Sequence, residues 1–480
     1  MIKYLQQSVK GKSKWLLTST AVGFVMLLLI LPVTSAGDDS GEKKQGNVFH
    51  FTDIHFNPLY DTNIEQVSKL KNSAAGDWED IFKRSKFKKL VTDRGKRPKE
   101  YANETTYNLL VSSLKAMKEV SKEQMPDFII FTGDFLVHNF DTKYENNFGS
   151  KEGFEEFIKK TVSFVVIMFD NYFPRVPVYV SLGNNDSYKG NYIIEPGGKF
   201  LKDTMRIISE KWLEKESNRE SFAETYPVGG YYTVLPPNSG NTRVISLNSI
   251  FFHSRHEKKY NDCKWAFDQL DWLRKQLEAA KEKNEKVWLL MHSPPGADYF
   301  EAFDGKFVPY WQYYYTAVFT RLIADYSSIL EAAYAGHTHM DEFQLVFDCM
   351  GRSDKAIAFV KICPSDSNVR NTNNPAFLNL IYNRTDFSLR DYGVYYLDLG
   401  KSTKKWALEY MFTKAYNQTC VNAAALQAVY DDLKNDEAMR TRYMNYFSVN
   451  LPQAVIPLNW NAYWCGIGNL RQEDFEACKK

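Results

Sequence analysis

The sequence lacks a strong charge of either sign. Its 480 residues include 60 basic and 58 acidic side chains, which gives a formal net charge of +2 at pH 7. Proteins that bind the nucleic-acid backbone carry a marked excess of lysine and arginine, so this balance predicts no nucleic-acid partner. The sequence also has no long apolar run after its first 33 residues. We therefore expect no later segment to span a membrane.

The N-terminal segment has the pattern of an export signal. Several lysines precede an apolar run over residues 16–33, and Thr34-Ser35-Ala36 then offers small residues for cleavage. We expect a signal peptide over residues 1–36, a polar linker over 37–46, and a secreted, periplasmic or luminal protein. The apolar run is close to the lower length limit of a membrane span. An uncleaved type II anchor, which would be the chain's membrane contact, is therefore the alternative.

Cysteine is scarce, with six residues in the whole chain. An even number of cysteines in an exported chain permits three disulfide bonds, but the sequence alone fixes none of the fifteen possible pairings. Free, buried cysteines are the alternative. The oligomeric state is left open by the sequence.

Polar blocks follow the apolar runs that predict buried strands. Such runs cover residues 48–51, 128–131, 178–180 and 287–290, and amphipathic segments that predict helices lie between them. This alternation predicts an α/β fold in which one sheet edge gathers the polar side chains at the strand ends. The five blocks are Asp53-Ile54-His55, Gly133-Asp134, Gly183-Asn184-Asn185-Asp186, His292 and Gly336-His337-Thr338-His339.

In this order the blocks resemble the calcineurin-like metallophosphoesterase superfamily. Residues 51–60, His138 after Gly133-Asp134, residues 336–343 and residues 374–377 resemble its acid sphingomyelinase-like phosphodiesterase branch. The resemblance implies a layered β-sandwich core flanked by helices over residues 47–400, and it also implies a disulfide between Cys465 and Cys478. Residues 401–480 have no motif of their own and predict a small, mainly helical C-terminal subdomain, with a strand at 406–412 and helix over 422–446.

The resemblance also assigns the ligands of two divalent metal ions. Imidazole and carboxylate ligands together suit zinc, iron or manganese, and zinc is the metal that the branch implies. Two such ions, about 3.5 to 4 Å apart, would hold a hydroxide for in-line attack on the phosphorus. One ion would be bound by Asp53, His55, Asp134 and His339, and the other by Asp134, Asn184, His292 and His337.

Asn185 departs from the pattern, because many members of the superfamily have histidine there. Asparagine can donate a hydrogen bond to a phosphoryl oxygen but cannot protonate a leaving alkoxide. We therefore predict that His138 is the general acid, since a helical turn after Asp134 would place both side chains on one face. The alternative is that His138 only supports the site or lies on the surface. The similar endopolyphosphatases also have Asn-Asn-Asp at this block, so Asn185 is compatible with activity.

Other candidates for the site carry less specific signals. His253 and His256 follow a predicted strand, and we interpret both as structural, with substrate contact as the alternative. His50 lies within the first predicted strand and is expected in the core. Residues 310–315 form an aromatic tract for which core packing is the default, although Trp311 and residues 313–315 could instead line a cleft.

The sequence therefore predicts an exported two-metal phosphodiesterase. The first metal block begins soon after Ala36, which leaves no space for the lipid-binding saposin-type domain that acid sphingomyelinases carry. This favours a soluble, nucleotide-like phosphoester over membrane sphingomyelin. One alternative is an endopolyphosphatase or a phosphomonoesterase such as a nucleotidase on the same scaffold. Another is a secreted binding protein that keeps metal for stability without catalysis.

Overall fold

A computed structural model describes residues 44–480, apart from position 62 and segments 92–103, 239–240, 257–262, 349–353, 369–371 and 452–458. The expected signal peptide and most of the expected linker lie outside these residues. Within the described part of the chain, no helix combines the length and the apolar character needed to cross a membrane.

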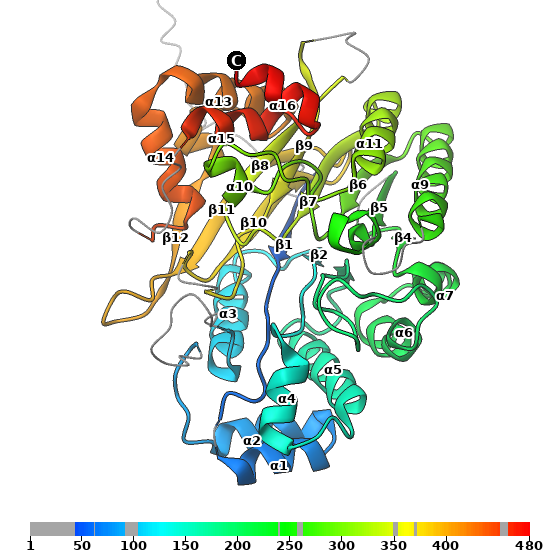
Figure 1. Cartoon of the computed structure of the whole chain (residues 1–480), viewed down its shortest axis with the longest axis vertical. Coiled ribbons are helices and arrows are strands. Elements are labelled where there is room, and N and C mark those ends of the chain that lie inside the picture. The colour runs from blue at the N-terminus through cyan, green and yellow to red at the C-terminus, as the bar shows by residue number, and fades with distance from the viewer. Residues whose placement is uncertain are drawn as a thin grey trace, which may run out of the picture. The chain divides into compact units, whose positions relative to one another are not determined.

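Two six-stranded sheets form the centre of the fold (Figure 1). In each sheet, parallel strands lie beside antiparallel ones. The first sheet has the order β12 (Trp406–Met411), β11 (Leu389–Leu397), β10 (Ala376–Asn383), β1 (Gln45–Phe51), β2 (Phe128–Phe131) and β3 (Val178–Val180). The second has the order β4 (Tyr232–Val234), β5 (Thr242–Ser246), β6 (Lys286–Leu290), β7 (Leu330–Ala335), β9 (Ala356–Ile362) and β8 (Glu342–Phe347).

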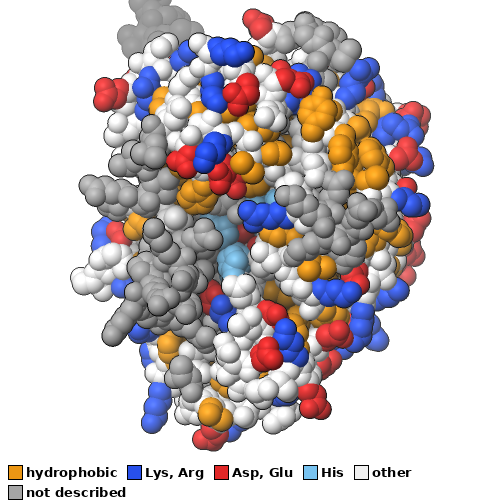
Figure 2. Space-filling view, in the orientation of Figure 1, with side chains coloured by type: hydrophobic (Ala, Val, Ile, Leu, Met, Phe, Trp, Pro, Cys, Tyr) orange, Lys and Arg blue, Asp and Glu red, His pale blue; other side chains and the backbone are white. Residues whose placement is uncertain are grey.

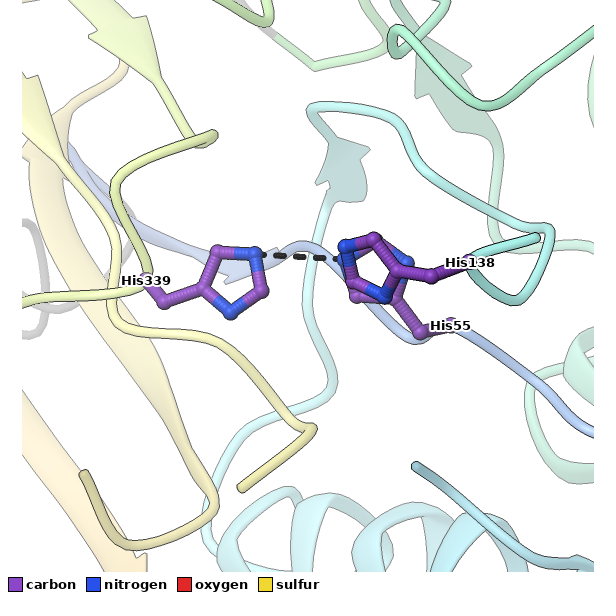
Figure 3. A group of neighbouring side chains, drawn as sticks. All are labelled: His55, His138 and His339. Carbon is purple, nitrogen blue, oxygen red and sulfur yellow. Dashed lines mark hydrogen bonds between the residues drawn. The ribbon is translucent and has the colours of Figure 1, made fainter. Parts of the chain in front are cut away.

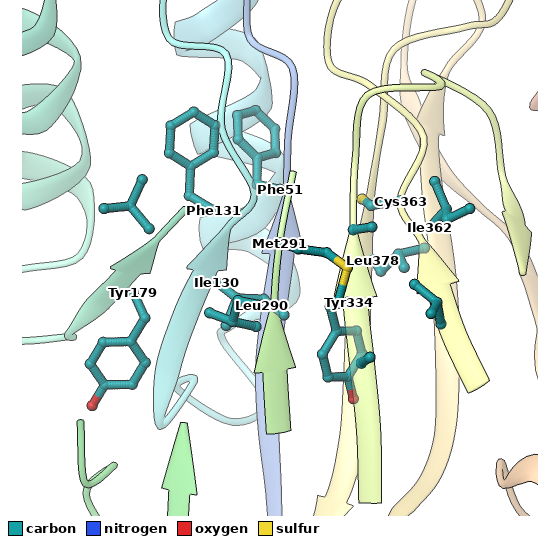
Figure 4. Close-up of a cluster of buried hydrophobic side chains, with 14 of the residues drawn as sticks. Phe51, Ile130, Phe131, Tyr179, Leu290, Met291, Tyr334, Ile362, Cys363 and Leu378 are labelled. Atoms are coloured by element: carbon teal, nitrogen blue, oxygen red, sulfur yellow. The ribbon is translucent and has the colours of Figure 1, made fainter. Parts of the chain in front are cut away.

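Strand β1 is buried on both faces because alternate side chains pack against different layers. Phe51 packs edge-to-face on Phe169 of helix α5 (Phe154–Tyr172), at a centroid distance of 5.7 Å. His50 points the opposite way and meets Tyr334 of the second sheet, at 5.5 Å. Figure 4 shows apolar side chains of both sheets in this core, among them Ile130 and Leu290. The sheets therefore form a sandwich.

Helices cover both outer faces of the sandwich. Helix α5 packs on the first sheet, while α9 contacts β5 and β6 and α11 contacts β8 and β9 of the second. The predicted layered α/β fold is confirmed. Before residue 330 the helices whose bounds lie within the described residues are α1 (Ile64–Asn72), α2 (Trp78–Arg84), α3 (Tyr107–Val120), α4 (Phe140–Phe148), α5 (Phe154–Tyr172), α6 (Lys199–Trp212), α7 (Glu216–Gly229), α9 (Lys264–Glu282), α10 (Tyr299–Phe303) and α11 (Tyr313–Tyr326), with 3₁₀ turns η2 (Ala75–Asp77) and η3 (Ser249–Phe252).

The C-terminal segment adds strand β12 and then five helices to the described structure. Helices α13 and α15 pack on strands β8 and β9 of the second sheet. The expected continuous helix over 422–446 is interrupted at Asp436, whose side chain accepts a hydrogen bond from the Met439 amide and so begins a new helix. These helices are α12 (Phe412–Tyr416), α13 (Ala423–Asn435), α14 (Glu437–Phe447), α15 (Trp460–Gly468) and α16 (Gln472–Cys478).

A disulfide joins α15 to α16. It links Cys465 to Cys478, which confirms the pairing that the resemblance implied. Cys263, Cys363 and Cys420 form no disulfide in the described structure, and Cys349 lies outside the described residues.

Candidate metal centre and active-site cleft

All seven predicted ligands follow the ends of parallel strands. Loops after β1, β2 and β3 of the first sheet carry Asp53, His55, Asp134 and Asn184, whereas loops after β6 and β7 of the second carry the other three. The carboxyl ends of parallel strands meet at one edge of a sheet. Because both sheets present this edge to the same place, side chains far apart in the sequence converge there.

The first group of donor atoms comprises Asp53 Oδ1, His55 Nε2, Asp134 Oδ2 and His339 Nε2. His55 Nε2 lies 3.2 Å from His339 Nε2, 3.5 Å from Asp134 Oδ2 and 3.7 Å from Asp53 Oδ1. His339 Nε2 lies 3.2 Å from Asp53 Oδ1. Donor atoms about 2.1 Å from a shared tetrahedral metal ion lie about 3.4 Å from one another, so these residues fit one metal ion.

The second group comprises Asp134 Oδ2, Asn184 Oδ1, His292 Nε2 and His337 Nδ1. His292 Nε2 lies 3.0 Å from Asn184 Oδ1, 3.2 Å from His337 Nδ1 and 3.5 Å from Asp134 Oδ2. These separations also fit a single metal ion. Asp134 Oδ2 is common to both groups, as a bridging carboxylate would be.

Two of the imidazoles are oriented by backbone carbonyls. His55 Nδ1 lies 3.1 Å from the Leu136 carbonyl, and His292 Nδ1 lies 2.6 Å from the Thr132 carbonyl. A carbonyl oxygen accepts only from a protonated nitrogen, so each Nε2 is left with the lone pair that a metal requires. The orientation of these rings therefore matches the role of a ligand.

Five of the seven predicted ligands have backbone conformations that side chains other than glycine rarely adopt. Asp53, His55, Asp134, His337 and His339 have φ between 45° and 73°. Each such residue costs on the order of 1–3 kcal/mol and persists where the surrounding structure requires it. This concentration of strain marks the block loops as a functional site.

Two glycines make space for the carboxylates. A Cβ atom at Gly183 would collide with the Asp134 carboxylate, and a Cβ atom at Gly336 would collide with Thr52 and Asp53. The glycines of these two blocks therefore allow the loops to approach the ligands closely.

The electrostatics of the cluster favour bound cations. Asp53 and Asp134 are almost fully buried, at 0% and 1% exposure. Burial opposes a charged imidazole, yet the charges of Asp134 and Asp53 raise the pKa of His292 to about 9. Burial also opposes ionisation of Asp53, whose pKa is nevertheless held well below its usual range by His339 and His292. Two buried carboxylates thus draw positive charge into the site, which metal ions would supply.

His138 lies beside the first group, although not for the reason that the sequence suggested. The chain from Asp134 to His138 is not helical, because Leu136 instead forms a β-bridge with Phe56. The His138 ring stacks on His55 at a centroid distance of 3.9 Å (Figure 3). His55, His138 and His339 also offer nitrogens within 4.8 Å of one another. Burial, then the neighbouring histidines, lower the pKa of His138, which favours its neutral form.

Asn185 contacts the bridging carboxylate. Its backbone amide donates to Asp134 Oδ1 at 2.8 Å, and its side-chain amide donates to Asp134 Oδ2 at 2.8 Å. The neighbouring Asp186, to which the sequence gave no role, accepts from the backbone amides of Asp134 and Gly183 at 2.9 and 2.8 Å. The third block therefore holds Asp134 by both residues that follow Asn184.

Several residues near the site carried no clear signal in the sequence. Tyr192 OH lies 3.4 Å from His337 Nε2, and the buried His253 ring lies 5.7 Å from His337 and 4.4 Å from Tyr192. His256 Nδ1 lies 3.0 Å from the Tyr192 carbonyl, which supports this loop. Spacing could not reveal Tyr192, because it lies eight positions after Asn184 on an irregular loop.

A cleft of about 270 Å³ opens over the cluster. Figure 2 shows histidine side chains at the surface near the middle of this face. Of the aromatic tract at 310–315, Tyr310 lines the cleft, whereas Trp311 is fully buried and lies elsewhere. The described lining residues are Glu104, Asp134, His138, Asn139, Lys143, Asn184, Asn191, Tyr192, Arg255, Asp298, Tyr299, Phe300, Tyr310, His337, Thr338, His339 and Thr372.

Comparisons with known proteins agree with this geometry. The calcineurin-like phosphoesterase family matches residues 46–341, and the acid sphingomyelin phosphodiesterase C-terminal region matches residues 356–480. Sphingomyelinase phosphodiesterase C of Dictyostelium discoideum is 28% identical over 85% of this chain and 86% of its own length. Human acid sphingomyelinase-like phosphodiesterase 3b is 27% identical over 90% of this chain and 89% of its own length.

A third relative is the human cyclic GMP-AMP phosphodiesterase SMPDL3A, which is 24% identical over 94% of this chain and 93% of its own length. The relatives thus share both matched regions with this chain. The chain belongs to the calcineurin-like phosphoesterase family, within its acid sphingomyelinase-like branch, and is a metal-dependent hydrolase of phosphoric esters.

Proposed function

We propose that this protein is an exported phosphodiesterase that hydrolyses a soluble, nucleotide-like phosphodiester at a two-metal centre. The observation that carries the proposal is the convergence of two donor groups on one shared oxygen, Asp134 Oδ2. Asp53, His55, Asp134 and His339 would hold one ion, and Asp134, Asn184, His292 and His337 the other. Zinc is the proposed metal, with manganese or iron as alternatives, because nitrogen and oxygen donors suit all three.

The bound ions would supply Lewis acidity and an activated water for in-line displacement at phosphorus. The protein's own residues then position the remaining parts of the reaction. Asn185 and Asp186 fix the bridging carboxylate through the hydrogen bonds described above. His138 would protonate the leaving oxygen, for which its place in the cleft lining is suitable. Since its neutral form is favoured, it would first have to take up a proton.

Aromatic side chains of the cleft support a substrate that carries a ring. Phe300 is 41% exposed, and its ring lies 4.0 Å from that of Tyr299, centroid to centroid. Both line the cleft. An exposed aromatic face can stack on any of the nucleobases. Four of the relatives that cover most of this chain are named as phosphodiesterases of cyclic GMP-AMP, a nucleotide diester.

A substrate panel on metal-reconstituted protein tests this proposal. The panel compares a nucleotide diester, a sphingomyelin vesicle, a phosphomonoester, a nucleoside triphosphate and inorganic polyphosphate. We expect the nucleotide diester to have the highest kcat/KM and chelation to abolish its turnover. Faster turnover of polyphosphate would support the endopolyphosphatase alternative, which the Asn185 block favours, and faster monoester turnover would support a nucleotidase. Full metal occupancy without turnover of any substrate would support a binding protein.

A further inference from the structure

Two basic side chains line the described part of the cleft, and their surroundings differ. Lys143 Nζ lies 2.8 Å from Glu104 Oε1 and donates to the His138 carbonyl at 2.8 Å. Its charge is therefore paired with a buried carboxylate. Because His138 stacks on His55, Lys143 also lies on the side of the first metal group.

Arg255 lies on the side of the second metal group. Its guanidinium is 5.2 Å from the centroid of the Tyr192 ring, and its Nη1 is 3.5 Å from the Tyr192 hydroxyl. That hydroxyl is in turn 3.4 Å from His337 Nε2. One tyrosine ring thus connects a predicted metal ligand to the arginine. A guanidinium held on an aromatic face loses little further freedom when it binds an anion.

The structure shows no ion pair of Arg255 with any residue that it describes. Among the described residues, no carboxylate lies within ion-pair distance of this exposed guanidinium. Asp298 also lines the cleft and interacts electrostatically with Arg255, but the two side chains form no ion pair. The cleft therefore offers an oriented cation beside the metal centre, without an ion-pair partner in the part of the chain that the structure describes.

We propose that Arg255 binds a second anionic group of the substrate, a phosphate other than the one being hydrolysed. This inference rests on the proposed function and narrows its substrate class to phosphodiesters with at least two phosphoryl groups, such as dinucleotides. A guanidinium matches a phosphate through two parallel hydrogen bonds, which makes such a contact strong as well as specific.

The test uses two esters that differ only in the second phosphate. They are the p-nitrophenyl ester of thymidine 5′-monophosphate and the same ester with an added 3′-phosphate. We expect the wild-type protein to prefer the second ester. Arg255→Gln should lower kcat/KM for that ester by at least about 10-fold, mainly through KM, and change the first ester by less than about twofold. Arg255→Lys should cause a smaller loss than Arg255→Gln, because lysine keeps the positive charge but lacks the paired N–H donors of the guanidinium.

Arg206→Gln is the matched control, since Arg206 is an exposed arginine on α6 outside the cleft. It should leave both esters unchanged. An equal loss on both esters after Arg255→Gln would show a merely structural role and would overturn the proposal. No loss on the ester with two phosphates, or no wild-type preference for it, would also overturn the proposal.

Binding measurements separate this proposal from the proposed function. Calorimetry compares thymidine 3′,5′-bisphosphate with thymidine 5′-monophosphate on metal-loaded protein. Arg255→Gln should remove the tighter binding of the bisphosphate even if neither ester is hydrolysed. Failure of turnover alone would contradict the phosphodiesterase proposal, whereas equal binding of both nucleotides by the wild-type protein would contradict the role of Arg255.

Discussion

The two sheets contribute different chemistry to the metal centre. The first sheet supplies both carboxylates, Asp53 and Asp134, as well as the Asn184 amide and a single imidazole, whereas the second supplies imidazoles alone. The oxygen that both donor groups share comes from the first sheet. Each imidazole of the second sheet serves one group. The first sheet therefore joins the two proposed metal sites, and the second completes each of them separately.

The largest expected effect follows from removing the shared carboxylate. Asp134→Asn should lower phosphodiester turnover by at least about 10³-fold, because two proposed sites lose a charged ligand and metal catalysis supplies several kcal/mol. Metal analysis should show that fewer than two ions are bound per chain. Asp141→Asn serves as control, because the half-buried Asp141 pairs with Lys151 and does not line the cleft. If Asp134→Asn binds two ions and keeps normal turnover, the bridging role is wrong.

Removing an imidazole of the second sheet should damage only one site. His337→Ala should leave one tightly bound ion per chain and lower turnover by roughly 10²-fold. Metal titration followed by calorimetry separates the two binding events. Loss of both ions in His337→Ala, to the same extent as in Asp134→Asn, would remove the distinction between the sheets.

His138 belongs to the first sheet's side of the cleft but is proposed to act on the leaving group rather than on a metal. His138→Ala should lower turnover of diesters with alkoxide leaving groups by about 10²-fold and of p-nitrophenyl esters only slightly, because nitrophenolate needs no proton. Both bound ions should remain. An equal loss with both leaving groups would contradict the role as general acid, and loss of an ion would instead make His138 a ligand.

The smallest expected effect concerns Glu409, a carboxyl of the first sheet. It lies on β12, and its buried carboxylate oxygens have neither an ion pair nor a hydrogen-bond partner among the described residues. Burial, then Asp341, raises the pKa of Glu409 to about 9. The folded protein therefore holds a proton that the unfolded chain releases near pH 4, so this group reduces stability as pH rises from about 4 to 9.

Glu409→Gln should remove this pH dependence. We expect the variant to have a higher Tm than the wild-type protein at pH 8 and a smaller difference at pH 5. Thermal unfolding at the two pH values measures the effect. A Tm difference that is the same at both pH values would show that Glu409 is not protonated by its surroundings.

The sequence predicted the strand ends because apolar runs stop where the polar blocks begin, as at Phe51 and Phe131. A buried strand cannot continue through Asp53 or Asp134, so the position of the ligands followed from elementary patterning. The same reasoning failed for the path from Asp134 to His138. A β-bridge at Leu136 there replaces the assumed helical turn.

Local periodicity also could not reveal contacts made by irregular loops. Tyr192 and His253 meet at His337 although they come from different loops, and no spacing relates them. The left-handed conformations of Asp53, His55 and His337 were equally hidden, because these residue types do not require them. Strain of this kind is imposed by the assembled site, and only the structure records it.

Anomalous diffraction from crystals of the metal-reconstituted protein tests whether two metal ions share Asp134. We expect two peaks about 3.5–4 Å apart, one among Asp53, His55 and His339 and the other among Asn184, His292 and His337, with Asp134 between them. A single peak, or two peaks of which neither contacts Asp134, would show that Asp134 does not bridge two ions.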